Sequence, residues 1–159
     1  MSDENHSPRS AGKRRTPAVP GASVDPVRSR MMASVGGKNT KPERVVRRYL
    51  HRLGFRFGLH AKRLPGRPDV VLPKYRTVVF VHGCFWHHHP GCRYAIVPKT
   101  RREFWLEKFE KNAERDARNI SDLKSEGWEV IVVWECQTRS VENLASGLEP
   151  LLERKRQSA

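Results

Sequence analysis

The segment Asp69-Val70-Val71-Leu72-Pro73-Lys74-Tyr75-Arg76-Thr77-Val78-Val79-Phe80-Val81-His82 decides the fold of this chain. Its two apolar runs, Asp69–Leu72 and Thr77–His82, flank Pro73-Lys74-Tyr75, a composition typical of a tight turn. The segment therefore predicts a hairpin of two short strands. Side chains alternate along a strand, so we expect Phe80 and His82 to share a face.

Upstream of the hairpin, the sequence predicts one helix and one further strand. Thr40-Lys41-Pro42-Glu43 has the spacing of a capping box, and Gly54 ends the helix that this box opens. Phe55–Leu59 then has the composition of a short strand.

Downstream, the pattern alternates between helix and strand. Thr100-Arg101-Arg102-Glu103 is a second capping box, and it predicts a long helix that ends at Gly127. We expect that helix to bury a stripe made of Leu106, Phe109, Ala113, Ala117 and Ile120.

The C-terminal part predicts one more strand and a last helix. Glu129–Trp134 is strongly apolar, which favours a strand buried on both faces and parallel to its neighbour. Ser140 caps a final amphipathic helix whose apolar residues are Leu144, Leu148, Leu151 and Leu152. The fold class is thus α/β, a mixed sheet flanked by helices.

Composition and charge limit the possible functions of the chain. The chain has 159 residues, a formal net charge of +14 and a pI of about 10.4, which predicts attraction to a polyanion such as nucleic acid. Residues 1–27, rich in Ser, Pro, Gly, Ala and Arg, predict a disordered basic tail, and residues 28–159 a single domain. No apolar run is long enough to span a bilayer and no signal peptide is evident, so we expect a cytoplasmic protein with no membrane partner.

Acidic residues are scarce in the middle of the chain. Between Lys41 and Pro98 there are twelve lysines or arginines but only two acids, Glu43 and Asp69. Because a carboxylate repels phosphate, a surface that faces DNA avoids acids unless they hold a divalent cation such as Mg²⁺. The simpler alternatives are that Glu43 only closes its capping box and that Asp69 only caps a turn.

An acid on one strand and a polar group on the next resembles the layout of PD-(D/E)xK nucleases, the restriction-endonuclease-like fold. The chain departs from that pattern, because Phe80-Val81-His82 stands where an acid, any residue and lysine are expected. Phosphodiester hydrolysis needs a base, a cation and a leaving-group acid. We therefore expect His82 and His87 to take part, with Mg²⁺ on Asp69 and Glu43 as a possible second ligand.

A cysteine and histidine cluster follows the hairpin. Cys84, His89 and Cys92 lie within nine residues, and Cys136 follows the last predicted strand. Such a set predicts a closed tetrahedral zinc site, which would be structural. Spacing alone leaves open which of His87, His88 and His89 is the nitrogen ligand. The alternative is a group of buried thiols beside a run of histidines.

Large aromatic residues lie inside and beyond this cluster. Phe85 and Trp86 are hard to bury completely in a ligand loop, and Trp105 lies at the margin of the long helix's stripe, with Phe104 on the opposite side. Aromatic side chains in a basic cleft can stack on bases or wedge between base pairs. Packing of the first helical turn against a loop is the alternative for Trp105 and Phe104.

Several blocks in order resemble the very short patch repair (Vsr) endonucleases over roughly residues 28–139. They are Lys38–Glu43 (KNTKPE), Leu64–Asp69 (LPGRPD), His82–His89 (HGCFWHHH), Glu103–Lys108 (EFWLEK), Lys111-Asn112, Glu114–Asp116 (ERD) and Val133–Cys136 (VWEC). The resemblance implies a restriction-endonuclease-like domain with a structural Zn²⁺ and a catalytic Mg²⁺. It also implies that one DNA strand is nicked beside the thymine of a T·G mispair, the product of 5-methylcytosine deamination.

The resemblance also implies roles for single residues. Asp69 would bind Mg²⁺ together with the backbone carbonyl of Val81, His87 would be the general base, His82 would contact phosphate or metal-bound water, and Glu43 would be a supporting acid. Zinc ligands would be Cys84, His89, Cys92 and Cys136, and the residues that intercalate into DNA would be Phe85, Trp86 and Trp105.

Two departures from the family pattern stand out. Val81 replaces a frequent threonine, and Pro90-Gly91 lengthens the interval between His89 and Cys92 by one residue. The resemblance further implies a monomer in the bacterial cytoplasm, associated with the nucleoid, with mismatched double-stranded DNA and mismatch-repair proteins as partners. Two other functions remain open, a general restriction-like nickase and a non-catalytic, zinc-stabilised DNA-binding module.

Overall fold

A computed structural model describes residues 37–158 of the chain. The tail predicted for residues 1–27, and the start of the domain predicted to follow it, lie outside the described residues. The described elements are α2 (Lys41–Arg52), β1 (Gly58–Leu59), β2 (Val70–Leu72), β3 (Thr77–His82), α3 (Arg102–Ser125), β4 (Glu129–Trp134), α4 (Val141–Gly147) and α5 (Glu149–Gln157), with short 3₁₀ turns at Pro73–Tyr75 and Glu135–Arg139.

The four strands form one mixed sheet in the order β1-β2-β3-β4. Strands β1, β2 and β3 are antiparallel, with Val70 opposite Val79, which confirms the predicted hairpin over the turn at Pro73–Tyr75. Strand β4 runs parallel to β3 over all six residue pairs, from Thr77 beside Glu129 to His82 beside Trp134. The crossover between these two parallel strands is α3.

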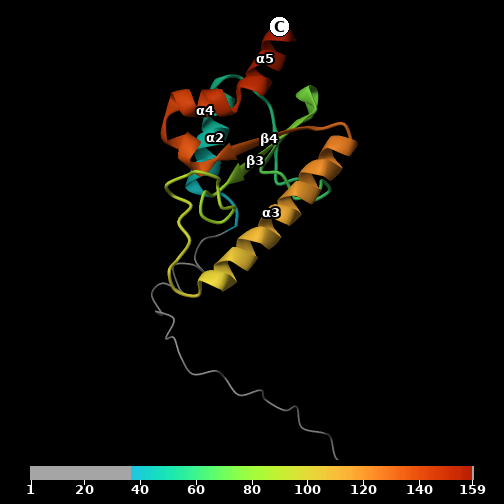
Figure 1. Cartoon of the computed structure of the whole chain (residues 1–159). Helices are drawn as coiled ribbons and strands as arrows, with labels where there is room; N and C mark the ends of the chain where they lie inside the picture. The colour runs from blue at the N-terminus through green and yellow to red at the C-terminus, as the bar shows by residue number, and fades with distance from the viewer. Residues whose placement is uncertain (1–36, 159) are drawn as a thin grey trace, which may run out of the picture. The chain divides into compact units, whose positions relative to one another are not determined.

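Each face of the sheet carries its own apolar core, as the alternation of strand side chains requires. Val70, Val79 and Val133 point to the face covered by α2, α4 and α5. The opposite face presents Val71, Val78 and Phe80 to Leu123 of α3. Figure 1 shows this layering, with α2 and α4 on one side of β3 and β4 and the long α3 on the other.

Helix α3 is longer than the sheet that it covers. Its 24 residues span about 36 Å, whereas a six-residue strand spans about 20 Å, so one half of the helix extends past the sheet. The predicted stripe is therefore wrong in part. Only Phe109 and Leu123 are buried along the helix, whereas Leu106 is 41% exposed and Ala113 and Ala117 are exposed.

Two of the three predicted helix N-caps are confirmed. Thr40 caps α2 in a complete capping box with Glu43, and Ser140 caps α4 by accepting a hydrogen bond from the Asn143 N–H. The second predicted capping box is wrong, because Arg101 occupies the N-cap of α3 in a left-handed conformation with a φ of 53° and gives no side-chain cap.

Two other elements are shorter than predicted. The strand expected over Phe55–Leu59 is only Gly58–Leu59, because Phe55 instead packs in the core at 1% exposure. The single C-terminal helix is two helices, α4 and α5, since Pro150 lacks the N–H that a continuous helix needs. Among residues 37–158, no helix combines the length and the apolar character that crossing a bilayer requires.

Candidate active site

Asp69 lies at the end of the sheet where β2 begins and β3 ends. Its Oδ2 accepts a hydrogen bond of 2.8 Å from the Val81 N–H, just beyond the last ladder pair of the hairpin. Burial raises the pKa of Asp69, and the nearby Glu43 carboxylate adds to the rise. The N–H and C=O of one strand residue point to the same side, so the Val81 carbonyl is directed toward the Asp69 side of β3.

Glu43 is buried at the N-terminus of α2 and is already well supplied with donors. It accepts hydrogen bonds from the backbone N–H groups of Asn39 and Thr40, from the Thr40 hydroxyl and, at 2.6 Å, from the Arg47 guanidinium. The structure thus brings Glu43 near Asp69 but engages both of its oxygens locally. A ligand role for Glu43 would require it to release one of these donors.

His60 completes this corner of the site, and the sequence reasoning missed it. One of its ring nitrogens lies 3.7 Å from Glu43 Oε2 and the other 3.8 Å from Asp69 Oδ1, so the three residues form a possible metal-binding group. Only the position of His60 in the sequence could have pointed to it. His60 directly follows the predicted strand that pairs with the one beginning near Asp69.

His82 and His87 form a stacked pair at the end of β3. Their ring centroids are 3.8 Å apart and the ring planes differ by 6°. Burial, with the charge of His87 as a second cause, lowers the pKa of His82 to about 4. His82 is therefore neutral at neutral pH.

Asp116 of α3 orients His87, and the sequence reasoning assigned no role to it. His87 Nδ1 lies 2.5 Å from Asp116 Oδ2. Burial alone would raise the pKa of Asp116, but the hydrogen bond to His87 and the charge of that ring outweigh burial and lower it. An ionised carboxylate only accepts, so Nδ1 carries the proton and Nε2 of His87 is left as the basic nitrogen. Asp116 stands inside the block Glu114–Asp116, which was the only signal for it.

The four predicted zinc ligands come together behind the histidine pair. The donor atoms of Cys84, His89, Cys92 and Cys136 all lie within 4.8 Å of one another. His89 Nδ1 is 3.7 Å from Cys84 Sγ and 3.5 Å from Cys136 Sγ. A tetrahedron with zinc bonds of roughly 2.3 Å to sulfur and roughly 2.05 Å to nitrogen has edges of about 3.5 Å, so the donor set fits Zn²⁺.

The loop between β3 and Cys92 positions this group. The His89 ring stacks on Trp134 with a centroid distance of 4.0 Å, which turns Nδ1 toward the thiols. The Cys92 N–H donates to the His89 carbonyl, and Gly91 between them has a φ of 68°, a conformation that favours glycine. Pro90 and Gly91 thus lie in a turn that brings Cys92 to the group.

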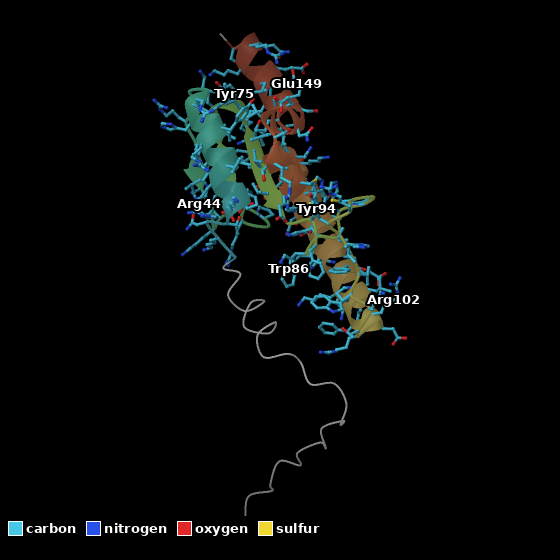
Figure 2. All side chains as sticks on the ribbon, turned by 90° about the vertical axis from the view of Figure 1, so that its left-hand side faces the viewer. Arg44, Tyr75, Trp86, Tyr94, Arg102 and Glu149 are labelled. Carbon is cyan, nitrogen blue, oxygen red and sulfur yellow. The ribbon has the colours of Figure 1, made fainter. Side chains whose placement is uncertain are left out.

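The aromatic residues of this loop pack against the overhanging half of α3. Phe85 contacts Trp86, Trp105 and Phe109 edge-on, at centroid distances of 5.2 to 5.4 Å. The Lys108 ammonium lies 5.6 Å from the Trp86 ring and 5.8 Å from the Trp105 ring. Figure 2 shows Trp86 beside the half of α3 that begins near Arg102. The structure therefore joins the three predicted DNA-wedge residues into one aromatic cluster.

The donor chemistry at Asp69 suits a hard cation. A carboxylate oxygen and a backbone carbonyl oxygen are ligand types that Mg²⁺ accepts, with water filling its other positions. Burial raises the pKa of Asp69, and a cation bound beside this carboxylate would lower it again. The residues present thus fit both implied metals, the soft set at Cys84 and the hard set at Asp69.

Comparisons with known proteins show which family the chain resembles. Residues 24–93 match the family model described as DNA mismatch endonuclease Vsr. The chain is 48% identical to the DNA mismatch endonuclease Vsr of Escherichia coli (strain K12), over 80% of either chain. It is also 48% identical to the type II nicking enzyme V.XorIIP of Xanthomonas oryzae pv. oryzae, over 82% of this chain and 96% of the relative.

A third relative is the type II nicking enzyme V.NmeAIP of Neisseria meningitidis, which is 50% identical over 71% of this chain and 80% of its own length. On this evidence, the chain belongs to the Vsr family of DNA mismatch endonucleases.

Proposed function

We propose that this protein nicks one strand of duplex DNA beside the thymine of a T·G mispair, by Mg²⁺-dependent hydrolysis of a phosphodiester bond. The observation that carries the proposal is the His87–Asp116 pair, stacked on a neutral His82 at the end of β3. A histidine oriented by a carboxylate supplies the positioned base that a strand-cleaving enzyme needs.

His87 acts as the general base in this proposal. Asp116 fixes the tautomer, so Nε2 faces away from the carboxylate and can remove a proton from the attacking water. Neutral His82 keeps positive charge low beside His87 until that proton arrives, and it can hydrogen-bond to a phosphate oxygen. His82 is the last residue of β3, and His87 lies between the proposed zinc ligands Cys84 and His89.

Asp69 and the Val81 carbonyl hold the cation in this proposal. When bound, Mg²⁺ supplies positive charge that stabilises the developing charge on the phosphate. Glu43 supports this corner by fixing Arg47 and the first turn of α2. The site would thus be a variant of the PD-(D/E)xK layout, in which the histidines at the end of β3 stand in for the missing lysine.

The four zinc ligands serve as a structural element in this proposal. Four protein donors leave no open position on a tetrahedral Zn²⁺, so that ion would take no part in the reaction. The ligands Cys84 and His89 enclose Phe85, Trp86 and His87 in the sequence. Binding of zinc would therefore fix the wedge and the base in one step.

Duplex DNA would lie between the basic surface of α2 and the aromatic cluster. The exposed side of α2 presents Arg44 (labelled in Figure 2), and a cleft of about 500 Å³ beside it is lined by Arg47, Arg48, His51, Arg52 and Phe57. Arginines at this spacing can neutralise successive phosphates. Phe85, Trp86 and Trp105 would then enter the duplex at the mispair. We further propose that the protein acts as a monomer in the bacterial cytoplasm, near the nucleoid, together with mismatch-repair proteins.

Cleavage of matched and mismatched duplexes tests the proposal. Purified protein with Mg²⁺ should nick a duplex that contains T·G and leave the same duplex with T·A or C·G intact. Asp69→Asn should abolish nicking, whereas Asp122→Asn, the same change at an exposed position on α3, should not.

Two results would overturn parts of the proposal. Equal nicking of matched and mismatched duplexes would leave a general restriction-like nickase. Tight binding to DNA without cleavage in Mg²⁺, Mn²⁺ or Co²⁺ would leave a non-catalytic DNA-binding module. A panel of T·G duplexes with varied flanking bases would then define the sequence context.

A further inference from the structure

His60 lies between Arg47 and Asp69, and these two neighbours decide where its ring proton sits. Arg47 Nη2 is 2.9 Å from His60 Nε2, and His60 Nδ1 is 3.8 Å from Asp69 Oδ1. The ring therefore has a cation on one edge and a carboxylate on the other. Its side chain is 19% exposed, so bulk water reaches only part of the ring.

The tautomer of His60 follows from the chemistry of its partners. A guanidinium has donors only, so His60 Nε2 must accept the hydrogen bond from Arg47 and cannot carry a proton of its own. The proton of the neutral ring is then on Nδ1, on the edge that faces Asp69. The 3.8 Å separation is longer than a hydrogen bond, but catalytic contacts of this kind commonly tighten when the ligands bind.

We propose that His60 is a positioning residue for Asp69: Arg47 fixes its tautomer, and the Nδ1–H then orients the carboxylate that receives the metal. The inference rests on the proposed role of Asp69 as the magnesium acid. With the Val81 N–H on Oδ2 and His60 beside Oδ1, both carboxylate oxygens have a donor in reach. Outer partners of this kind hold a metal ligand in its binding rotamer.

The strand register places His60 beside Asp69, where it can orient the carboxylate. Strand β1 pairs Leu59 with Val70, so continuing the register sets His60 opposite Asp69. The backbone at His60 is in the left-handed region with a φ of 47°, a conformation unfavourable for most side chains. Residues held in such conformations cluster at functional sites, because the surrounding structure must enforce them.

Arg47 is itself fixed and cannot easily leave His60. Its Nη2 also donates to Glu43 Oε2 at 2.6 Å, and its Nη1 donates to Asn39 Oδ1 at 2.6 Å. The guanidinium is mostly buried, with 13% of the side chain exposed. The capping acid of α2 therefore anchors the arginine that sets the tautomer of His60.

Direct metal binding by His60 is the competing possibility. Glu43, His60 and Asp69 offer ligand atoms within 4.8 Å of one another, which is close enough for one ion. However, the Arg47 guanidinium already stands against both Glu43 Oε2 and His60 Nε2. A divalent cation bound to the same atoms would meet that positive charge at close range, so we place the metal on Asp69 and not on His60.

The tautomer can be measured directly by ¹⁵N NMR of the histidine side chains in the zinc-loaded protein at mildly alkaline pH. Protonated and unprotonated ring nitrogens of a neutral imidazole have well-separated ¹⁵N shifts. We expect the proton of His60 on Nδ1, and a mixture of tautomers in Arg47→Met. If Arg47→Met does not fold, Arg47→Gln serves the same purpose, because an amide can accept as well as donate and so does not fix the tautomer. A proton on Nε2 in the wild-type protein would overturn the proposal.

Metal binding by the DNA-free protein gives a second readout that does not depend on activity. Mn²⁺ can be titrated and its free signal followed by electron paramagnetic resonance. His60→Gly removes the ring without straining the left-handed backbone, and we expect it to weaken Mn²⁺ binding by about tenfold or more. His60→Asn tolerates the same backbone and returns an N–H donor on the side of Asp69, so it should restore most of the affinity.

The outcomes separate this inference from the function on which it rests. Wild-type Mn²⁺ affinity in His60→Gly, with binding lost in Asp69→Asn, would refute the role of His60 alone. Unchanged affinity in Asp69→Asn would instead refute the assignment of the magnesium site. A large shift of His60 Nε2 on addition of diamagnetic Mg²⁺ would show direct coordination and overturn the positioning role.

Discussion

The imidazole of His87 lies flat against that of His82, with the ring centroids 3.8 Å apart. Two imidazolium ions stacked this closely would repel each other, so the stack disfavours a positive charge on both rings. The pKa of His82 is lowered to about 4, so this ring is neutral at neutral pH, and Nδ1 of the neighbouring His87 faces Asp116. The stack thus joins a buried neutral ring to an oriented base.

Replacing Asp116 should damage catalysis more than DNA binding. An asparagine there can donate to His87 Nδ1 and stabilise the wrong tautomer, which removes the base from Nε2. We expect Asp116→Asn to lower the single-turnover nicking rate by about 10²–10⁴-fold, with DNA affinity little changed. Glu114→Gln, at an exposed acid on the same helix, is the matched control. A wild-type rate in Asp116→Asn would rule out the proposed base.

The free energy of unfolding should decrease as the pH is lowered, over a range set by the pKa of His82 in the unfolded and folded states. Its pKa is lowered from 6.5 to about 4 in the folded state, mainly by burial, so the unfolded chain binds the proton more readily. Stability is then fully present above about pH 6.5 and is lost as pH falls toward about 4, by about 3 kcal/mol.

Urea unfolding of zinc-loaded protein between these pH values measures the effect. His82→Gln cannot titrate, so its stability should fall less over the same window. The difference between the two proteins removes the contribution of the thiolates, which is common to both. Parallel stability curves for wild type and His82→Gln would show that His82 titrates alike in the folded and unfolded states.

Substitution of one proposed cysteine ligand should lower both the zinc content of the protein and its free energy of unfolding. Metal analysis should find about one zinc per chain, and Cys136→Ser should lower that content and destabilise the fold by several kcal/mol, because the ligands assemble only in the folded state. His88→Ala is the control, since His88 lies in the same loop but stacks on Phe109 outside the donor group. Undiminished stability in metal-free protein would contradict a structural zinc.

Removal of a wedge ring should weaken recognition of the mispair. Stacking on a base is worth about 1–3 kcal/mol per aromatic side chain, so Trp105→Ala should raise the Kd for a T·G duplex by about 5- to 150-fold. Binding to the matched duplex should change less, because in the proposed complex the α2 arginines would contact only phosphates. Phe104→Ala tests the neighbouring ring, which is 42% exposed and which we place outside the wedge. Equal losses on both duplexes would assign Trp105 to general binding.

Local patterns in the sequence were sufficient for most of the fold. The hairpin, the strand Glu129–Trp134 and the caps at Thr40 and Ser140 depend on neighbours along the chain, and each was predicted correctly. The predictions failed where contacts between residues distant in the sequence decide the structure. Leu106 fits a helical stripe, but the sheet ends before it can cover that part of α3.

The candidate site divides in the same way. Asp69, His82, His87 and the four proposed zinc ligands were singled out from residue type, spacing and family resemblance, because metals and proton transfers demand particular side chains, and their roles stay predictions. Asp116 and His60 were not, since each lies far along the chain from the residue that it contacts. Hydrogen bonds between distant residues depend on how the strands and α3 pack, and spacing in the sequence does not encode that packing.

The sequence by itself determined the class of protein, the ligand types and the strand that ends in His82. Only the tertiary structure decided that Asp116 faces His87, that Arg47 faces His60 and that the Glu43 oxygens are already engaged. The physical reason is that a proton's position depends on the partners of a ring, and those partners are brought together by packing between elements distant in sequence.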